Sequence, residues 1–203
     1  MSKRQRDEFP GAINHVTARG NNGRPIFTSN SDRTQFLDIL ATIAAKRRWI
    51  CHAYCLMGNH YHLLIQTLEP DLGAGMRHLN GRYAVGFNHR SARKEHLFGE
   101  RYHPAPIRTD AHLLEAARYI LLNPVRAGIC GRPGDWRWSS FRATMGETPM
   151  PPYLESETLL SFFGNEPKRA REMFRLFIGE GLPENVNHDS LSPIVERRVE
   201  VTP

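Results

Sequence analysis

Two strand-like runs separated by only three residues constrain the fold of this chain most. Residues 50–57 and 61–68 are rich in apolar and aromatic side chains, and Gly58 and Asn59 lie in the connection between them. A glycine and an asparagine in so short a connection are typical of the tight turn of a β-hairpin. The two runs are therefore predicted to pair as antiparallel neighbours in one sheet.

Three amphipathic segments are predicted to be helices, because apolar residues recur in them at helical spacing. The first begins near Asp32, which has a glutamine three residues later as in a capping box, and it ends in a run of three cations at 46–48. The second covers residues 71–90. The third is capped by Asp110, and the Asn-Pro pair at 123–124 is expected to stop it.

Two further strands complete a predicted order of β-α-β-β-α-β-α. Residues 12–19 alternate and end at a glycine, and a short strand is expected near 106–109. This order predicts an α+β fold in which helices cover an antiparallel sheet, of the ferredoxin-like, split-βαβ kind that is also RRM-like. Residues 1–145 are predicted to form this core. Residues 146–203 are predicted to add a linker, two short helices and a loose polar tail.

Positive charge is concentrated in the first three quarters of the chain. The net charge is +6, yet residues 1–150 carry +9 and residues 151–203 carry −3. Arginine supplies 23 of the 27 basic residues, and its planar guanidinium suits phosphate and stacks on nucleobases. Nucleic acid is therefore the leading candidate partner, although a basic surface alone also fits an ordinary soluble protein.

Membrane insertion and secretion are not expected from the sequence. No run of eighteen or more apolar residues occurs, and the basic N-terminal residues lack the apolar core of a secretory signal. The three cysteines, an odd number, do not indicate a disulfide framework. We therefore expect a cytoplasmic protein without a membrane partner.

A pair of histidines in the second run of the hairpin is a candidate metal site. His60 and His62 are two residues apart, so in a strand their imidazoles project from the same face and can converge on one cation. Paired histidines in strands are, however, often only hydrogen-bonded surface residues. Tyr119 and Asn123, four apart in the third helix, share one helix face. This spacing displays a hydroxyl nucleophile and an oxygen ligand together, although a core aromatic followed by a helix-ending asparagine gives the same pattern.

Five segments of the chain, in this order and spacing, resemble one known family. They are HVTARGNNGRPIF, CHAYCLMGNHYHLLIQT, MRHLNGRYAVGFNHR, HLFGERY and ARYILLNPVRAGI. Together they resemble the single-tyrosine HUH transposases (HUH denotes His-hydrophobic-His) of the smallest bacterial insertion sequences. Within that family the chain is most similar to the REP-associated tyrosine transposases, which are linked to repetitive extragenic palindromes. The resemblance covers roughly residues 9–145.

The resemblance implies both a site and a reaction. It assigns the two metal-binding histidines to His60 and His62, the nucleophile to Tyr119 and a third metal contact to Asn123. A divalent cation, Mg²⁺ or Mn²⁺, would polarise the scissile phosphodiester. Tyr119 would attack to form a 5′-phosphotyrosine and free a 3′-hydroxyl, and a later 3′-hydroxyl would reverse the step and rejoin the strands.

The substrate implied by the resemblance is single-stranded DNA folded into a hairpin, bound through backbone charge and aromatic stacking. The insertion-sequence relatives act as dimers, whereas the REP-associated branch that this chain resembles is expected to act as a monomer. A bacterial, nucleoid-associated protein is implied. The candidate DNA-contacting residues are Arg19, Asn21, Arg24, Arg77, Arg82, Arg101 and Arg126.

A structural zinc site is one alternative. Cys51, Cys55, His60 and His62 place four potential ligands within twelve residues. In an extended strand, however, the two cysteines stand about 13 Å apart, too far for both sulfurs to bind one ion at about 2.3 Å. Two small buried thiols on the core face of the strand are the favoured interpretation.

Binding without catalysis is a second alternative. RNA-recognition domains have the same element order, but their aromatic Lys/Arg-Gly-Phe-type signature is missing from this chain. A catalytically inactive, sequence-specific DNA-binding protein derived from a transposase also fits the motifs. The acidic C-terminal part has its own hypothesis: it could lie across the DNA site and restrain binding, or it could be a solvated tail with two packed helices.

Overall fold

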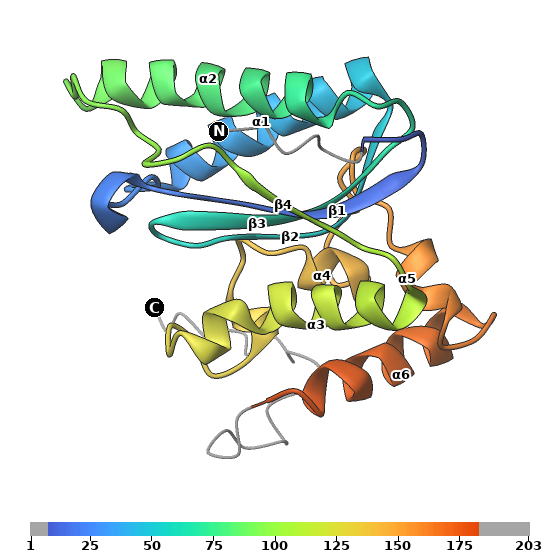
Figure 1. The fold of residues 1–203 in the computed structure, drawn as a ribbon. Helices are drawn as coiled ribbons and strands as arrows, with labels where there is room; N and C mark the ends of the chain where they lie inside the picture. The colour runs from blue at the N-terminus through green and yellow to red at the C-terminus, as the bar shows by residue number, and fades with distance from the viewer. Residues whose placement is uncertain (1–7, 183–203) are drawn as a thin grey trace, which may run out of the picture.

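One four-stranded antiparallel sheet with helices on both faces makes up the computed structural model, which describes residues 8–182 (Figure 1). The strand order is β2-β3-β1-β4. Helices α1 and α2 cover one face and α3 lies against the other, so the predicted α+β fold is confirmed. The elements of this core are β1 (Ala12–Arg19), η1 (Asn21–Gly23), α1 (Asn30–Arg47), β2 (Trp49–Leu56), β3 (His60–Thr67), α2 (Leu72–Arg90), β4 (His103–Pro106) and α3 (Asp110–Arg126).

Alternation along the strands divides the buried side chains into two cores. In β3 the odd-numbered Tyr61, Leu63 and Ile65 pack with α1 and α2, whereas Leu64 packs on the other side with α3. All four side chains are fully buried, and each contributes roughly 1.5–3 kcal/mol by leaving water. A one-residue change of register would exchange the two faces, so this pattern fixes which side chains of β3 meet α3.

The chain after α3 packs under the same face of the sheet. It forms η2 (Pro133–Asp135), α4 (Phe141–Thr144), α5 (Glu157–Ser161) and α6 (Pro167–Gly179). Leu159 of α5 and Phe174 and Ile178 of α6 share the core of α3, so these helices are part of the packed body. The two short helices expected after the linker correspond to α5 and α6. Almost all of the predicted loose tail lies outside the described residues.

Three helix boundaries differ from the prediction. The cap of α1 is Ser29, whose hydroxyl accepts the Asp32 N–H at 3.1 Å while the Asp32 carboxylate accepts the Ser29 N–H, so Asp32 is the third helical residue rather than the cap. Likewise Thr109, not Asp110, caps α3.

The Asn-Pro pair at 123–124 does not stop α3, which continues to Arg126. A proline removes only its own N–H, and the Ala127 N–H still reaches the carbonyl of the preceding turn at 3.0 Å.

The fourth strand begins three residues earlier than predicted. β4 pairs with residues 14–17 of β1 and contains Pro104 and Pro106. Proline is a poor strand residue except at the edge of a sheet, where one side of the strand needs no donors. β4 occupies such an edge, which explains why its sequence does not look like a strand.

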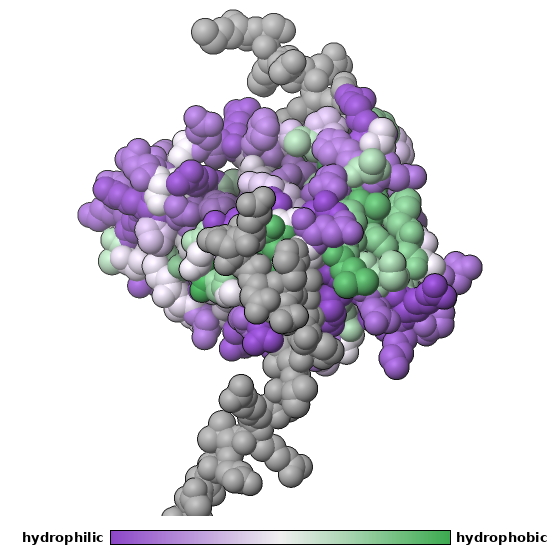
Figure 2. All heavy atoms as spheres, turned by 90° about the horizontal axis from the view of Figure 1, so that it is seen from below, coloured by the Kyte–Doolittle hydropathy of each residue, from purple (hydrophilic) through white to green (hydrophobic). Residues whose placement is uncertain are grey.

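Seen from below, the surface is mostly hydrophilic and carries a large apolar area on the right of the view (Figure 2). In the described part of the chain, no helix combines the length and the hydropathy needed to cross a bilayer.

Candidate active site

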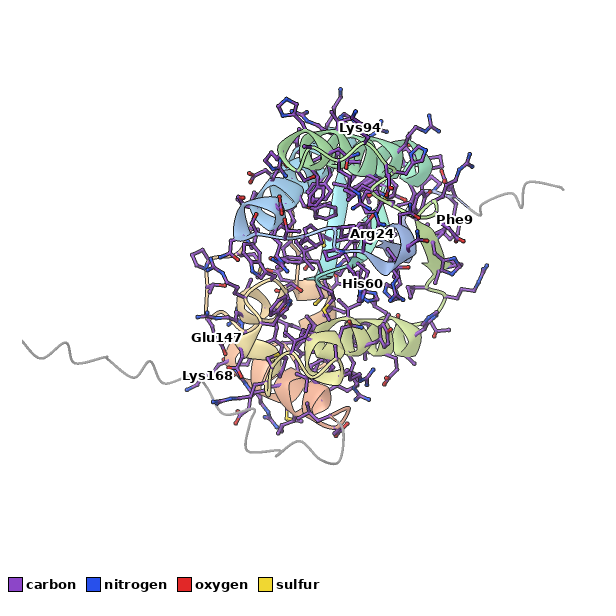
Figure 3. The ribbon with its side chains drawn as sticks, turned by 90° about the vertical axis from the view of Figure 1, so that its left-hand side faces the viewer. Phe9, Arg24, His60, Lys94, Glu147 and Lys168 are labelled. Carbon is purple, nitrogen blue, oxygen red and sulfur yellow. The ribbon has the colours of Figure 1, made fainter. Side chains whose placement is uncertain are left out.

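β1, β3 and α3 line an open pocket of about 620 Å³. The odd-numbered residues of β1 and the even-numbered residues of β3 face α3, so both strands bring side chains to this helix. Figure 3 places His60 between the sheet and α3. The lining side chains include His15, Thr17, Arg19, His60, His62, His112, Glu115 and Tyr119. Three of the four predicted site residues therefore line one pocket.

Asn123 joins these residues through His60. The Asn123 side-chain oxygen lies 3.4 Å from Nε2 of His60, and Asn123 is one helical turn after Tyr119 on α3. The four residues that the sequence singled out are thus brought together from β3 and α3. Their assigned roles remain predictions.

The phenol of Tyr119 is the open part of the site. Its side chain is 42% exposed, in contrast to His62 at 5%. The ring lies edge-on to His62, with centroids 5.4 Å apart, and to His15 at 5.8 Å. These contacts hold the ring in place. Among residues 8–182, none forms a hydrogen bond with the Tyr119 hydroxyl. A substrate phosphate can therefore approach this oxygen from solvent.

Burial favours the neutral form of three histidines of the pocket, His15, His60 and His62. Burial, followed by the neighbouring His15 and His60, lowers the pKa of His62 to about 3. Burial, with His103 and His112, lowers the pKa of His15 to about 4. Burial also lowers the pKa of His60, against the opposing effect of Asn123. A neutral imidazole has a free lone pair, which is the form that a metal ligand requires.

His62 carries the clearest sign of an absent partner. Its Nε2 atom is buried and has no hydrogen-bond partner among the described residues. Its other nitrogen, Nδ1, lies 2.9 Å from Nε2 of His15. A buried polar atom without a partner is uncommon in folded proteins, and a bound ion is one of its ordinary explanations. The donor set of two imidazoles and one amide oxygen fits a divalent cation.

Two contacts in this site were not predicted from the sequence. His15 bonds to His62, and Asn59 accepts at 2.7 Å from Nδ1 of His60. The alternation of residues 12–19 could have placed His15 on the same face as Arg19. Only the strand order β3-β1, however, shows that this face lies beside His62.

The zinc alternative is not supported by the structure. Cys51 and Cys55 are both fully buried, and burial raises the pKa of each thiol well above its usual range. A bulge between Cys51 and Ala53 turns the strand, so Cys51 packs with α1 and α2 whereas Cys55 packs with α3. The expectation of one shared core face was therefore wrong, although both thiols are buried as expected. Across residues 8–182, no three His, Cys, Asp or Glu side chains are grouped to hold a metal ion.

Two of the predicted DNA-contacting arginines lie at the pocket. Arg19, at the end of β1, lines it. Arg126, at the end of α3, places its guanidinium carbon 5.6 Å from the Tyr119 ring centroid and donates to the Gly181 carbonyl at 3.2 Å. Both can reach an anion bound beside Tyr119.

The other five predicted residues lie away from Tyr119. Arg77 and Arg101 line a second pocket of about 670 Å³, between α2 and residues 96–102. Arg82 is exposed on α2. Arg24 follows η1 and forms an exposed ion pair with Glu95 at 2.7 Å. The fifth, Asn21, lies in η1. A DNA molecule that contacted all seven residues would extend well beyond the pocket.

Comparisons with known proteins agree with this arrangement. A family model described as "Transposase IS200 like" matches residues 10–122, which include β1, β3 and most of α3. A solved structure titled "Structure of the REP associates tyrosine transposase bound to a REP hairpin" has a TM-score of 0.61 and is 20% identical in sequence. The match covers 74% of this chain and 90% of that one. No curated protein sequence matches the chain.

Proposed function

Because this chain belongs to the IS200-like transposase family, we propose that it cleaves and rejoins single-stranded hairpin DNA through a covalent bond to Tyr119. The observation that carries this proposal is the exposed phenol beside two neutral imidazoles and one amide in a single pocket. The likeness to a REP-associated tyrosine transposase supports assigning the chain to that branch, with palindromic DNA as its substrate.

The proposed reaction exchanges one phosphodiester for another. The Tyr119 oxygen attacks the phosphorus, the bond from phosphorus to the 3′ oxygen breaks, and the phenolic proton ends on the released 3′-hydroxyl. The downstream strand remains attached as a 5′-phosphotyrosine. Attack by another 3′-hydroxyl reverses these bonds and rejoins DNA without an external energy source.

His60 and His62, through their Nε2 atoms, and Asn123, through its amide oxygen, are proposed to hold Mg²⁺ or Mn²⁺. When bound, the cation would polarise a phosphate oxygen and offset the negative charge that builds as the tyrosine attacks. The chain's own contribution is orientation. The edge-on contacts with His15 and His62 hold the Tyr119 ring, and Arg19 and Arg126 supply positive charge around the phosphate.

Covalent capture of DNA tests this proposal. The probe is a pool of single-stranded hairpins with a fixed stem, randomised flanks and a fluorophore at the 3′ end, because the 3′ fragment is the one that stays on the protein. With Mn²⁺, wild-type protein is expected to give a labelled species that survives denaturing electrophoresis. Tyr119→Phe is the matched control: it removes one oxygen from an exposed side chain and is expected to bind the hairpins without forming the adduct.

Two results would contradict the proposed activity. An adduct that survives in Tyr119→Phe would exclude this nucleophile. Hairpin binding by the wild type with no adduct in either Mn²⁺ or Mg²⁺ would favour the alternative of a catalytically inactive DNA-binding protein derived from a transposase. With either outcome, we propose that the chain binds nucleic acid and is nucleoid-associated in the bacterial cytoplasm.

A further inference from the structure

In each of the two histidines of the proposed metal site, the Nδ1 atom contacts a neighbouring side chain. Nδ1 of His60 meets Asn59, and Nδ1 of His62 meets His15. On the pocket side, Nε2 of His62 has no partner among the described residues, and Nε2 of His60 has the longer contact with Asn123, at 3.4 Å. A neutral imidazole carries one proton, so a bare Nε2 requires that proton to be on Nδ1. An acceptor facing Nδ1 selects this tautomer.

We infer that Asn59 and His15 are positioning residues that fix His60 and His62 as Nδ1–H tautomers, so that both Nε2 lone pairs face the same space. The metal half of this inference rests on the proposed function. The tautomers themselves do not, because they can be measured without DNA or metal.

Contact lengths and hydrogen-bond chemistry together determine what Asn59 does to His60. The Asn59 side-chain nitrogen donates to the Gly23 carbonyl at 3.0 Å, which fixes the orientation of the amide and turns its oxygen toward His60. Amide oxygens face both ring nitrogens of His60: that of Asn59 lies 2.7 Å from Nδ1, and that of Asn123 lies 3.4 Å from Nε2. Both oxygens only accept hydrogen bonds and a neutral ring has one proton, so the much shorter contact places that proton on Nδ1. Asn59 is also anchored through its backbone, since its carbonyl accepts the Gly20 N–H at 2.8 Å. The turn of the hairpin thus sets the state of the histidine that follows it.

Burial and geometry together determine what His15 does to His62. Either imidazole could donate across the 2.9 Å contact between His15 Nε2 and His62 Nδ1. If His15 donated, the proton of His62 would lie on Nε2, a buried atom with no acceptor among the described residues. If His62 donates, Nε2 presents a lone pair to the pocket, which a cation can satisfy. The second arrangement is the one that serves a metal ligand.

Both acceptors are uncharged, which suits a site for DNA. Metal-binding histidines often donate to a carboxylate, which adds a negative charge close to the ion. An amide oxygen and a neutral imidazole fix the tautomer without that charge. The approaching phosphodiester, itself an anion, therefore meets no carboxylate from these two partners.

Nitrogen NMR of histidine-labelled, metal-free protein tests the inference directly. Long-range ¹H–¹⁵N correlations distinguish the two tautomers of each ring. We expect Nδ1–H tautomers for His60 and His62 in the wild type. In His15→Leu, His62 is expected to become a mixture of the Nδ1–H and Nε2–H tautomers. In Asn59→Ala, the same change is expected for His60. His112→Leu is the matched control, because it removes another histidine from the pocket wall that bonds to neither ring.

Conservative variants separate a positioning role from a merely structural one. His15→Gln offers an oxygen acceptor in place of the imidazole nitrogen, and Asn59→Asp keeps an oxygen acceptor while losing the donation to the Gly23 carbonyl. Both are expected to restore the Nδ1–H signals. Mn²⁺ affinity, measured by electron paramagnetic resonance without DNA, is expected to fall by about 10–100-fold in His15→Leu and Asn59→Ala and to recover in the conservative pair.

The wild-type tautomers decide the inference even where a variant fails to fold. An Nε2–H tautomer at either histidine in the wild type would overturn it, as would unchanged signals in a folded His15→Leu or Asn59→Ala. If the tautomers are as inferred but no DNA adduct forms, the proposed function fails while the inference stands. If an adduct forms but the tautomers are the opposite ones, the inference fails while the proposed function stands.

Discussion

Gly75 lies where α2 passes the indole ring of Trp49. An added Cβ at this position would overlap ring atoms of Trp49. The ring has little freedom to move, since it is 4% exposed and its Nε1 donates to Asp71 at 2.7 Å. Gly75→Ala is therefore expected to lower the free energy of unfolding by about 1–3 kcal/mol through overpacking. Urea unfolding followed by tryptophan fluorescence measures this change.

Gly81 on the same helix provides the matched control. Nothing lies within 4 Å of its added Cβ. Because glycine is costly in a helix interior, Gly81→Ala is expected to raise the free energy of unfolding by about 0.5–1 kcal/mol. Equal effects of the two substitutions would mean that helix propensity, and not the contact with Trp49, controls both positions.

At the residue scale, the sequence predicts those parts of the site that follow from the periodicity of a single strand or helix. The period of two in a strand places His60 beside His62, and the spacing of four in a helix places Tyr119 beside Asn123. From the sequence, only the family resemblance implies that the two pairs meet. Neither periodicity predicts that His15 belongs to the site, because its contact with His62 depends on which strand neighbours β3.

The segment between α4 and α5 is tied to β2 through a buried histidine. Leu154 forms a bridge with Cys51, and Glu155 accepts from His52 at 3.0 Å and from Thr158 at 2.7 Å. Burial by itself would raise the pKa of the Glu155 carboxyl, but the hydrogen bonds from His52 and Thr158 together lower it to about 2. The carboxylate therefore stabilises the fold while it is charged.

The pH dependence of this contribution has a definite sign. Because the pKa of Glu155 is lower in the folded chain than its ordinary value of 4.5, the contribution is complete above about pH 4.5 and is lost as the pH falls toward 2. Glu155→Gln is expected to be less stable than the wild type at pH 7, and the difference is expected to shrink between pH 4.5 and 2. Urea unfolding midpoints at pH 7, 4 and 3 measure this narrowing.

Glu157→Gln serves as the control for Glu155, since its exposed side chain lies two residues away. Its unfolding midpoint is expected to stay close to that of the wild type at each pH. A Glu155→Gln difference that remained constant down to pH 3 would show that shape, and not the charge on Glu155, holds the segment to β2.

At the element scale, the quality of the prediction follows the strength of the local signal. The hairpin is predicted to within one residue, because its turn and both strands are contiguous in the sequence. The position of β4 is predicted less accurately. Its prolines are not typical of a strand, and the strand with which it pairs lies about 90 residues earlier in the chain. The bulge in β2 was not predicted from the sequence; it lies beside Cys51, which also bonds to the C-terminal segment at Tyr153 and Glu155.

Both edges of the sheet are closed to a further strand. Along β2, the Leu56 N–H donates to Trp138 at 2.8 Å and the Cys51 N–H donates to Tyr153 at 3.1 Å, so the chain's own C-terminal part covers this edge. In β4 the Ile107 N–H points to β1, and alternation therefore directs positions 104 and 106 outward. Both are prolines, which have no N–H to offer a partner strand.

A sheet closed in this way favours a monomer, which is the state that the resemblance to the REP-associated branch led us to expect. We expect light scattering coupled to size exclusion to give the mass of one chain, 23.2 kDa, independent of protein concentration. Replacing Pro104 and Pro106 together by threonine restores two outward donors at the β4 edge. The double variant is expected to self-associate as concentration rises, whereas the same exchange at Pro167, the first residue of α6, leaves the edge closed and serves as the control. A wild-type protein that dimerises with rising concentration would show that association uses a surface other than the sheet edges.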